Sequence, residues 1–159
     1  MNPFAGERAA AEVPDSGMLG DISASVFEAI DANGFIEVAL LMRRTGKILG
    51  AWTKGEISPE IVSVMAATML GSIETITEAL GRPSPERAVV ETERCRMLAE
   101  KFEPHGVLVL IATRDLSTDA LQRASLRIRD RVSAASVGAE RTRHMMSAEI
   151  QTTQRLPNR

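Results

Sequence analysis

Two short stretches of this 159-residue chain are apolar at nearly every consecutive position, residues 35–42 and residues 107–112. Alternate side chains of a strand point to opposite faces of a sheet, so a strand without polar alternation must be covered on both faces. Both stretches are much shorter than the roughly 20 apolar residues that cross a bilayer. They therefore predict the central strands of a sheet enclosed between helices, and no membrane span is expected.

Short turns connect the remaining predicted strands. Residues 43–46 turn the first strand back into a second strand over 47–53. Strands over 87–92, 95–102 and 107–113 follow one another through short turns, as antiparallel hairpins do. The first and fifth strands are the most apolar and belong in the middle, which gives the spatial order 2-1-5-4-3. The third strand then lies on an edge of the sheet.

Three helices are predicted around this sheet. The first is expected over 20–32, where apolar side chains recur at helical spacing. The second begins at Ser58-Pro59-Glu60, because a hydroxyl caps free backbone amides and proline suits the first helical position. The third follows Ser117 and has one apolar stripe. The members of that stripe are Leu121, Ser125, Ile128 and Val132.

The second helix is apolar on more than one flank, which is more than a single contact with a sheet requires. We expect its bulkier side chains to cover the sheet and its smaller ones to form a second flank that another helix can approach closely. The expected sheet-covering residues are Ile61, Met65, Met69, Ile73, Ile76 and Leu80. The expected second flank includes Val62 and Ala66.

The fold class is therefore α/β (α+β), with element order αββαβββα and one five-stranded antiparallel sheet between helices. An edge strand that carries Ala88, Val89 and Val90 invites another strand to pair with it. A two-fold dimer that joins third strand to third strand and second helix to second helix satisfies both exposed surfaces. The predicted dimer interface consists of Val62, Ala66, Met69, Ala88, Val89, Val90 and Glu91.

The two ends of the chain are predicted to lie outside this domain. Residues 1–18 lack any period and are expected to be a flexible leader, residues 19–133 form the domain, and residues 134–159 form a helical extension and tail. The single Cys95 has no disulfide partner in the chain, and the start of the sequence lacks a signal-peptide pattern. A cytoplasmic location is expected.

With this order of elements the sequence resembles the Roadblock / dynein light chain seven family over about residues 19–133. The resemblance rests on the element order, on residues 38–51 (VALLMRRTGKILGA), on the capped alanine-rich second helix and on the apolar last strand. It implies a profilin-like fold and homo- or heterodimers through the surfaces named above. It also implies a regulator or scaffold of small Ras-like GTPases, in which the paired second helices form a platform that orders the GTPase's own catalytic groups.

The platform candidates are the polar residues of the second helix. They are Glu60, Ser63, Thr68, Glu74, Thr75 and Glu78. Trp52 is a further candidate, because a lone tryptophan at an edge strand can anchor a partner. Packing at the rim of the domain explains Trp52 equally well.

No catalytic or metal-binding motif is recognisable. Gly46-Lys47 is followed by Ile48 where a phosphate loop requires Ser or Thr, and neither His105 nor His144 has a second ligand at metal-binding spacing. We therefore expect no enzyme activity, no cofactor and no metal. A structural adaptor of a larger assembly, without a GTPase partner, is the alternative function.

Nucleic-acid binding is the third class of function considered. Residues 114–159 hold nine basic side chains, all of them arginines and four of them in the predicted third helix, but five acidic side chains lie among them. Mixed charges of this kind are typical of an exposed helix face. The sequence alone therefore argues against nucleic acid as a partner.

Overall fold

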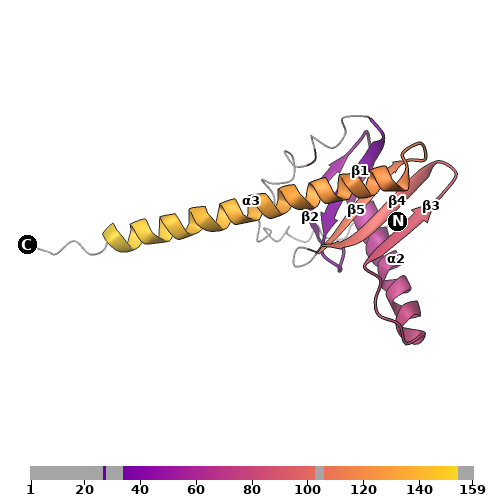
Figure 1. The fold of residues 1–159 in the computed structure, drawn as a ribbon, viewed down its shortest axis with the longest axis horizontal. Coiled ribbons are helices and arrows are strands. Elements are labelled where there is room, and N and C mark those ends of the chain that lie inside the picture. Colours follow the sequence, from indigo (N-terminus) through magenta and orange to yellow (C-terminus); the bar gives the residue numbers. More distant parts are fainter. Residues whose placement is uncertain (1–26, 28–33, 103–105, 154–159) are drawn as a thin grey trace, which may run out of the picture.

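A computed structural model of the chain describes residue 27 and residues 34–102 and 106–153. In this part of the chain one five-stranded antiparallel sheet lies between helix α2 and helix α3 (Figure 1). The order of the strands is β2-β1-β5-β4-β3, which confirms the prediction. The strands are β1 (Ile36–Met42), β2 (Ile48–Thr53), β3 (Arg87–Glu91), β4 (Cys95–Phe102) and β5 (Gly106–Thr113).

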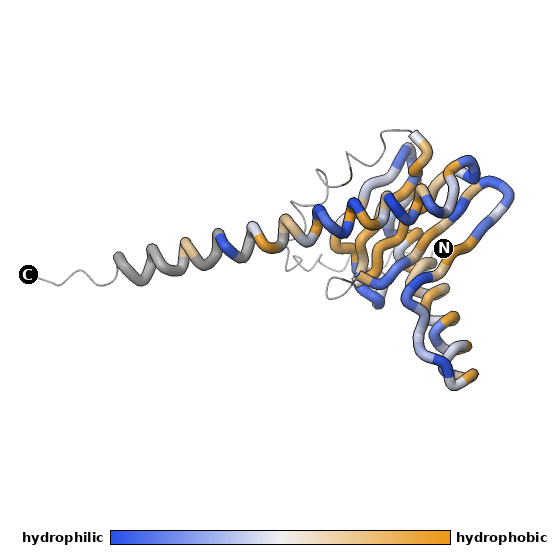
Figure 2. Tube along the Cα trace, in the orientation of Figure 1, coloured by the Kyte–Doolittle hydropathy of each residue, from blue (hydrophilic) through white to orange (hydrophobic). Residues whose placement is uncertain are grey.

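The two central strands, β1 and β5, are buried on both faces. Leu41 and Leu110 belong to a core beneath α3, whereas Leu40 and Val109 belong to a second core beneath α2. Figure 2 shows hydrophobic residues concentrated along these strands. The continuous apolar runs of the sequence thus have the cause expected for them, because each face of the sheet is closed by a helix.

Helix α2 (Pro59–Ala79) begins as the sequence predicts. The backbone N–H of Ile61 donates to the hydroxyl of Ser58 at 3.3 Å, and Pro59 occupies the first helical position. At the other end the chain leaves the helix through Gly81, whose φ of 65° lies in the left-handed region that glycine favours.

The rotation of α2 about its axis differs from the prediction. Ala66 is 3% exposed and lies on the sheet, with Val62 and Met69 packed beside it. The bulkier flank faces away, since Ile61 is 67% exposed and Met65 63%. Small side chains let the helix axis approach a sheet face already filled by large strand residues, so the alanine-bearing flank lies inside. The exposed large apolar residues of α2 and its C-cap are Ile61, Val64, Met65, Ile76 and Leu80.

Helix α3 (Thr118–Thr153) covers the other face. The backbone N–H of Ala120 donates to the hydroxyl of Ser117 at 3.2 Å, and the predicted stripe from Leu121 to Val132 is buried. The helix runs without a break past residue 134, and Val132 is the last side chain described as buried. The helix predicted over 20–32 lies outside the described residues except for Phe27, which is buried in the core beneath α3.

Candidate functional site

Strand β3 forms one edge of the sheet and pairs with β4. Lys101 N–H donates to the Glu86 carbonyl and Thr92 N–H to the Cys95 carbonyl, both at 2.9 Å. Antiparallel strands alternate between residues that bond to the neighbouring strand and residues that point away from it. Since residues 86 and 92 bond to β4, the backbone groups of Arg87, Val89 and Glu91 point to the free edge.

This alternation divides the edge residues predicted for a dimer. Val89 and Glu91 direct their N–H and C=O groups outward, whereas Ala88 and Val90 direct theirs into the sheet toward β4. The side chain of Val89 is also 40% exposed. The sequence missed Arg87, whose backbone belongs to the same outward set.

Arg87 is fixed at this edge by the buried carboxylate of Glu100 on β4. The Nε and Nη2 atoms of Arg87 lie 3.1 and 2.7 Å from Oε1 of Glu100. On the other side, Ser125 of α3 donates to Oε2 of Glu100 at 2.5 Å. One carboxylate therefore ties the edge strand, its neighbour and α3 together.

The second exposed feature is the side of α2 that faces away from the sheet, here called the α2 surface. Its apolar members are the five exposed residues named above, and Thr68, Ser72 and Thr75 lie among them. The hydroxyls of Thr68 and Thr75 each donate to a backbone carbonyl one turn earlier in the helix, at 2.9 Å. Large apolar side chains exposed together on one side of a helix indicate a site of interaction.

By length and composition α2 could cross a membrane, although only a small part of it is buried in the domain. The sequence did not lead us to expect this. The helix nevertheless forms one wall of a core, through Ala66, Val62 and Met69. Moving α2 into a bilayer would expose the face of the sheet that it covers.

The structure places the predicted platform residues of α2 in different environments. Glu60, Thr68, Thr75 and Glu78 are exposed, as the prediction requires. Ser63 is not available to a partner, because its side chain is 2% exposed and its hydroxyl donates to the Glu60 carbonyl at 2.9 Å. The placement of Ser63 on the platform is therefore wrong, and the cause is the rotation of the helix described above.

The same rotation corrects the helical part of the predicted dimer interface. Ala66 is buried within the domain, and Val62 and Met69 are partly buried against the sheet. They contribute to the core beneath α2, so Ala66 offers no surface to a second chain. The residues that α2 presents outward are Ile61, Val64 and Met65 instead.

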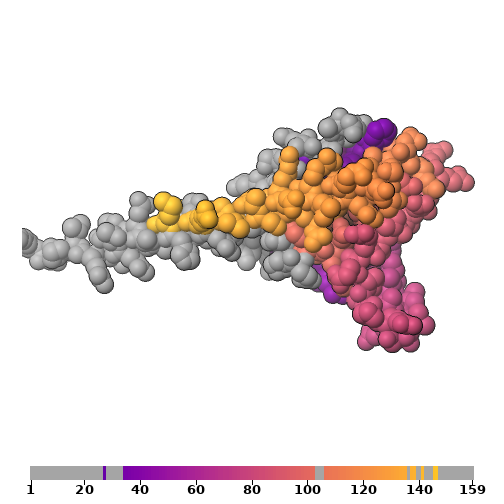
Figure 3. Space-filling model, in the orientation of Figure 1, coloured from indigo at the N-terminus to yellow at the C-terminus, as the bar shows by residue number. Residues whose placement is uncertain are grey.

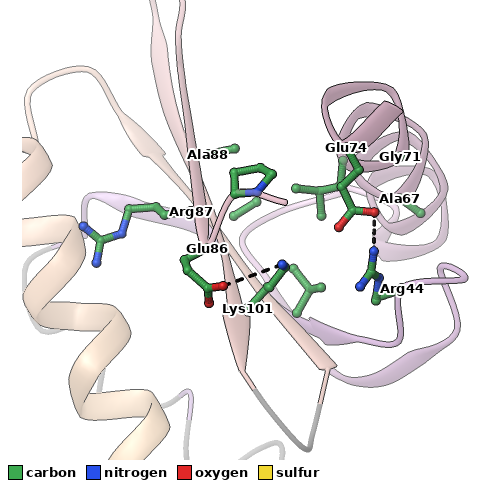
Figure 4. Close-up of a pocket in the computed structure, with 12 residues that line it drawn as sticks. Arg44, Ala67, Gly71, Glu74, Glu86, Arg87, Ala88 and Lys101 are labelled. Atoms are coloured by element: carbon green, nitrogen blue, oxygen red, sulfur yellow. Dashed lines mark hydrogen bonds and ion pairs between the residues drawn. The ribbon is translucent and has the colours of Figure 1, made fainter. Parts of the chain in front are cut away.

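Glu74 belongs to a hollow between α2 and the β3–β4 pair (Figure 4). Its carboxylate accepts hydrogen bonds from Arg44 and, at 2.8 Å, from Ser84, whose hydroxyl also accepts from Lys101 Nζ at 3.0 Å. Burial alone would raise the pKa of Glu74, but these hydrogen bonds and the charges of Arg44 and Lys101 outweigh it and lower the pKa. Glu74 therefore stays ionised and holds α2 to the β1–β2 turn.

Trp52 lies apart from the α2 surface. It is partly buried against the core beneath α3, on the opposite face of the sheet. Trp52 and the platform residues of α2 therefore do not form one continuous site.

Grouped metal-binding side chains are absent from the described part of the chain. Among these residues no three His, Cys, Asp or Glu side chains are grouped so that they could hold a metal ion. In the hollow beside Glu74, Arg44 pairs with Glu74 and Lys101 pairs with Glu86 (Figure 4). Arg87, which also lines the hollow, pairs with Glu100 instead. Among the described residues, the structure instead presents the outer edge of β3 and the apolar α2 surface.

No protein-family model matches the sequence, and the search of curated proteins also found no match. Solved structures do match. MglB of Myxococcus xanthus aligns over 82% of this chain and 96% of its own, with a TM-score of 0.62 at 10% identity. The gliding protein MglB from Thermus thermophilus aligns over 72% of this chain and 88% of its own, with a TM-score of 0.61 at 18% identity. A Roadblock/LC7 domain from Streptomyces avermitilis aligns over 74% of this chain and 96% of its own, with a TM-score of 0.61 at 13% identity.

The chain therefore has the profilin-like fold of Roadblock/LC7 domains, as the sequence resemblance predicted. Within that class it is similar to MglB, two structures of which align at 18% identity. One of these is described as MglB with a tetrameric arrangement.

Proposed function

We propose that this protein is a non-catalytic, dimeric interaction module of the cytoplasm that regulates or scaffolds a small Ras-like GTPase. The observation that carries the proposal is the exposed α2 surface on a domain in which, among the described residues, β3 pairs on one side only. The MglB-like fold and the sequence resemblance support the GTPase as partner.

The two exposed features have different roles in this proposal. The backbone groups of the β3 edge join two protomers into one continuous sheet, because a strand edge is satisfied only by another strand. The α2 helices of both protomers then lie on the same face of the joined sheet. They form an apolar platform that positions the GTPase's own catalytic groups without supplying a nucleophile or a metal.

The charge of α2 favours a protein over a membrane as the occupant of this platform. The helix contains Glu60, Glu74 and Glu78 but no lysine or arginine. Helices that bind membrane surfaces usually carry basic residues, which the anionic lipid headgroups attract. An acidic helix with an apolar outer side fits a protein groove better.

The proposal is tested by a pull-down of the organism's Ras-like GTPases, each loaded with GDP or with a non-hydrolysable GTP analogue. We expect one GTPase to bind the wild-type chain in a nucleotide-dependent way and to bind Met65→Asp at least about tenfold more weakly, since exposed apolar anchors dominate such contacts. Arg123→Ala, on the far helix, is the matched control and should bind like wild type. Absence of binding in both nucleotide states would overturn the GTPase partner.

A structural adaptor is the second candidate function. It is favoured by α3, whose part beyond Val132 exposes Val137, Met145 and Met146. Figure 3 shows α3 projecting from the rest of the domain. In that case the chain would co-purify from its own cells with a stable larger assembly and with no GTPase. Native mass spectrometry of the purified material distinguishes the two functions.

A further inference from the structure

The hollow beside Glu74 is a space that small side chains leave between α2 and the sheet (Figure 4). Ala88 of β3 lies opposite Ala99 of β4, and Ala67 of α2 lines the same space. Gly71 also lines it, and a methyl group added there would meet no atom within 4 Å. The space measures about 450 Å³, part of it open to solvent, which lies in the size range of small-molecule sites.

The hollow combines an apolar floor with a charged side chain. Ala99 and Lys101 are two residues apart on β4, so both lie on the face of the sheet that α2 covers. Val107 of β5 is the neighbour of Lys101 in the strand register, and Leu70 of α2 packs over the same core. The side chain of Lys101 therefore lies beside an apolar floor, which consists of Leu70, Ala99 and Val107.

The ammonium group of Lys101 is incompletely paired within the domain. Its side chain is only 17% exposed, and Nζ donates to the Ser84 hydroxyl at 3.0 Å. Among the described residues the carboxylate paired with Nζ is that of Glu86, whose Oε1 lies 3.7 Å away and whose side chain is 84% exposed. An exposed pair of this kind contributes little, and an ammonium has three hydrogens to donate. A largely buried cation therefore has a donor left for a ligand.

The charges around the hollow favour a ligand with a single negative charge. Of the described cations that line it, Lys101 alone lacks a carboxylate at hydrogen-bond distance. The carboxylates of Glu74 and Glu86 would repel the second charge of a phosphate, and a cationic ligand would meet Lys101 itself. An aliphatic tail on the anion would cover the apolar floor and remove it from water, which is favourable.

We propose that this hollow binds a small monocarboxylate with an aliphatic tail. The carboxylate accepts a hydrogen bond from Nζ of Lys101, and the tail covers the apolar floor. The bond from Lys101 is charge-assisted, and the low exposure of its side chain strengthens it. The site lies within one protomer, so the proposal goes beyond the proposed function and holds whether or not the chain binds a GTPase.

The probe for this site is sodium hexanoate, titrated at constant ionic strength into the isotope-labelled full chain and followed by NMR. We expect saturable shifts at Leu70, Ala99 and Val107, with a dissociation constant of about 1 mM or lower. Hexylamine and inorganic phosphate at the same concentrations should cause none of these shifts.

Two variants that lose the same charge test the role of Lys101. Lys101→Met keeps the length of the side chain and should weaken hexanoate binding at least about tenfold, because it removes a charge-assisted hydrogen bond. Lys47→Met is the matched control on the exposed turn between β1 and β2, outside the lining of the hollow, and should bind like wild type. If Lys101→Met does not fold, Ala88→Leu takes its place, since the larger side chain fills part of the hollow and should weaken binding as well.

The wild-type titration decides whether the site exists. Absence of saturable shifts, or shifts confined to the α2 surface, would overturn the site. Equal shifts with phosphate would overturn the aliphatic tail as part of the ligand. A folded Lys101→Met that binds hexanoate as tightly as wild type would overturn Lys101 as the residue that holds the carboxylate.

Discussion

Ser125 of α3 donates a 2.5 Å hydrogen bond to the carboxylate of Glu100 on β4, inside the core beneath α3. Burial alone would raise the pKa of Glu100, but the hydrogen bonds from Ser125 and Arg87 and the charges of Arg87 and Arg129 outweigh it and lower the pKa. The carboxylate is thus buried, ionised and fully engaged. It links the β3 edge, where we expect a second protomer, to the long helix α3.

Removing the hydroxyl should loosen this link. Ser125→Ala leaves one oxygen of a buried carboxylate without its donor, which costs about 1–3 kcal/mol of the free energy of unfolding. Ser133→Ala, on an exposed turn of the same helix, is the control and should change it by less than about 0.5 kcal/mol. Urea denaturation followed by circular dichroism measures both. Equal stabilities for the two variants would show that the hydrogen bond contributes nothing.

The same carboxylate should make the domain sensitive to acid. The pKa of Glu100 is lower in the folded chain than its ordinary value of 4.5. Its stabilisation is therefore fully present above the unfolded-state pKa and is lost as the pH falls through the folded-state pKa. We expect Glu100→Gln to be less stable than wild type at neutral pH and the difference to shrink below pH 4.5. Urea unfolding of both proteins from neutral pH to below pH 4.5 measures this difference in stability. A difference that does not change with pH would contradict the lowered pKa of Glu100.

The sheet could be predicted from sequence because β1 and β5 lack polar alternation, and strands covered on both faces must lie at the centre. The rotation of α2 could not be predicted in the same way. Both flanks of α2 are apolar at helical spacing, so periodicity did not choose between Ala66 and Met65 as the side toward the sheet. The contacts of Glu100 and Glu74 were also missed, because their partners are distant in sequence and no local pattern pairs them.

Two glycines should respond in opposite ways to an added methyl group. Gly106 has φ of 138°, and a Cβ there would overlap the carbonyl oxygen of Met42. Gly106→Ala should therefore destabilise the domain by about 3 kcal/mol or more. Gly71 lies in the interior of α2, and a methyl group added there would meet no atom within 4 Å, so Gly71→Ala should stabilise the helix by about 0.5–1 kcal/mol. Thermal and urea unfolding of both variants measure the signs. If both variants changed the free energy of unfolding equally, the predicted clash between a Cβ at residue 106 and the carbonyl oxygen of Met42 would be wrong.

The outward backbone groups of β3 lead to a prediction about dimerisation. The amide of Val89 points away from β4, so Val89→Pro removes no hydrogen bond of the isolated domain. It does remove a donor that a second protomer needs, and proline is tolerated on an edge strand. We expect Val89→Pro to be folded but monomeric, with dimer affinity reduced at least about tenfold by the lost hydrogen bonds and the proline ring. Size-exclusion chromatography with light scattering measures the change.

Val90→Pro is the matched control, one residue along the same strand. Its amide points into the sheet opposite Met97 of β4, so proline there breaks the ladder of the domain itself. Val90→Pro should therefore lower the thermal stability of the fold, while Val89→Pro should leave it near that of wild type. If Val89→Pro still dimerises with wild-type affinity, the protomers must meet elsewhere, and the exposed α2 surface would be the remaining candidate. If instead both variants unfold alike, the alternation that directs the amide of Val89 outward is wrong.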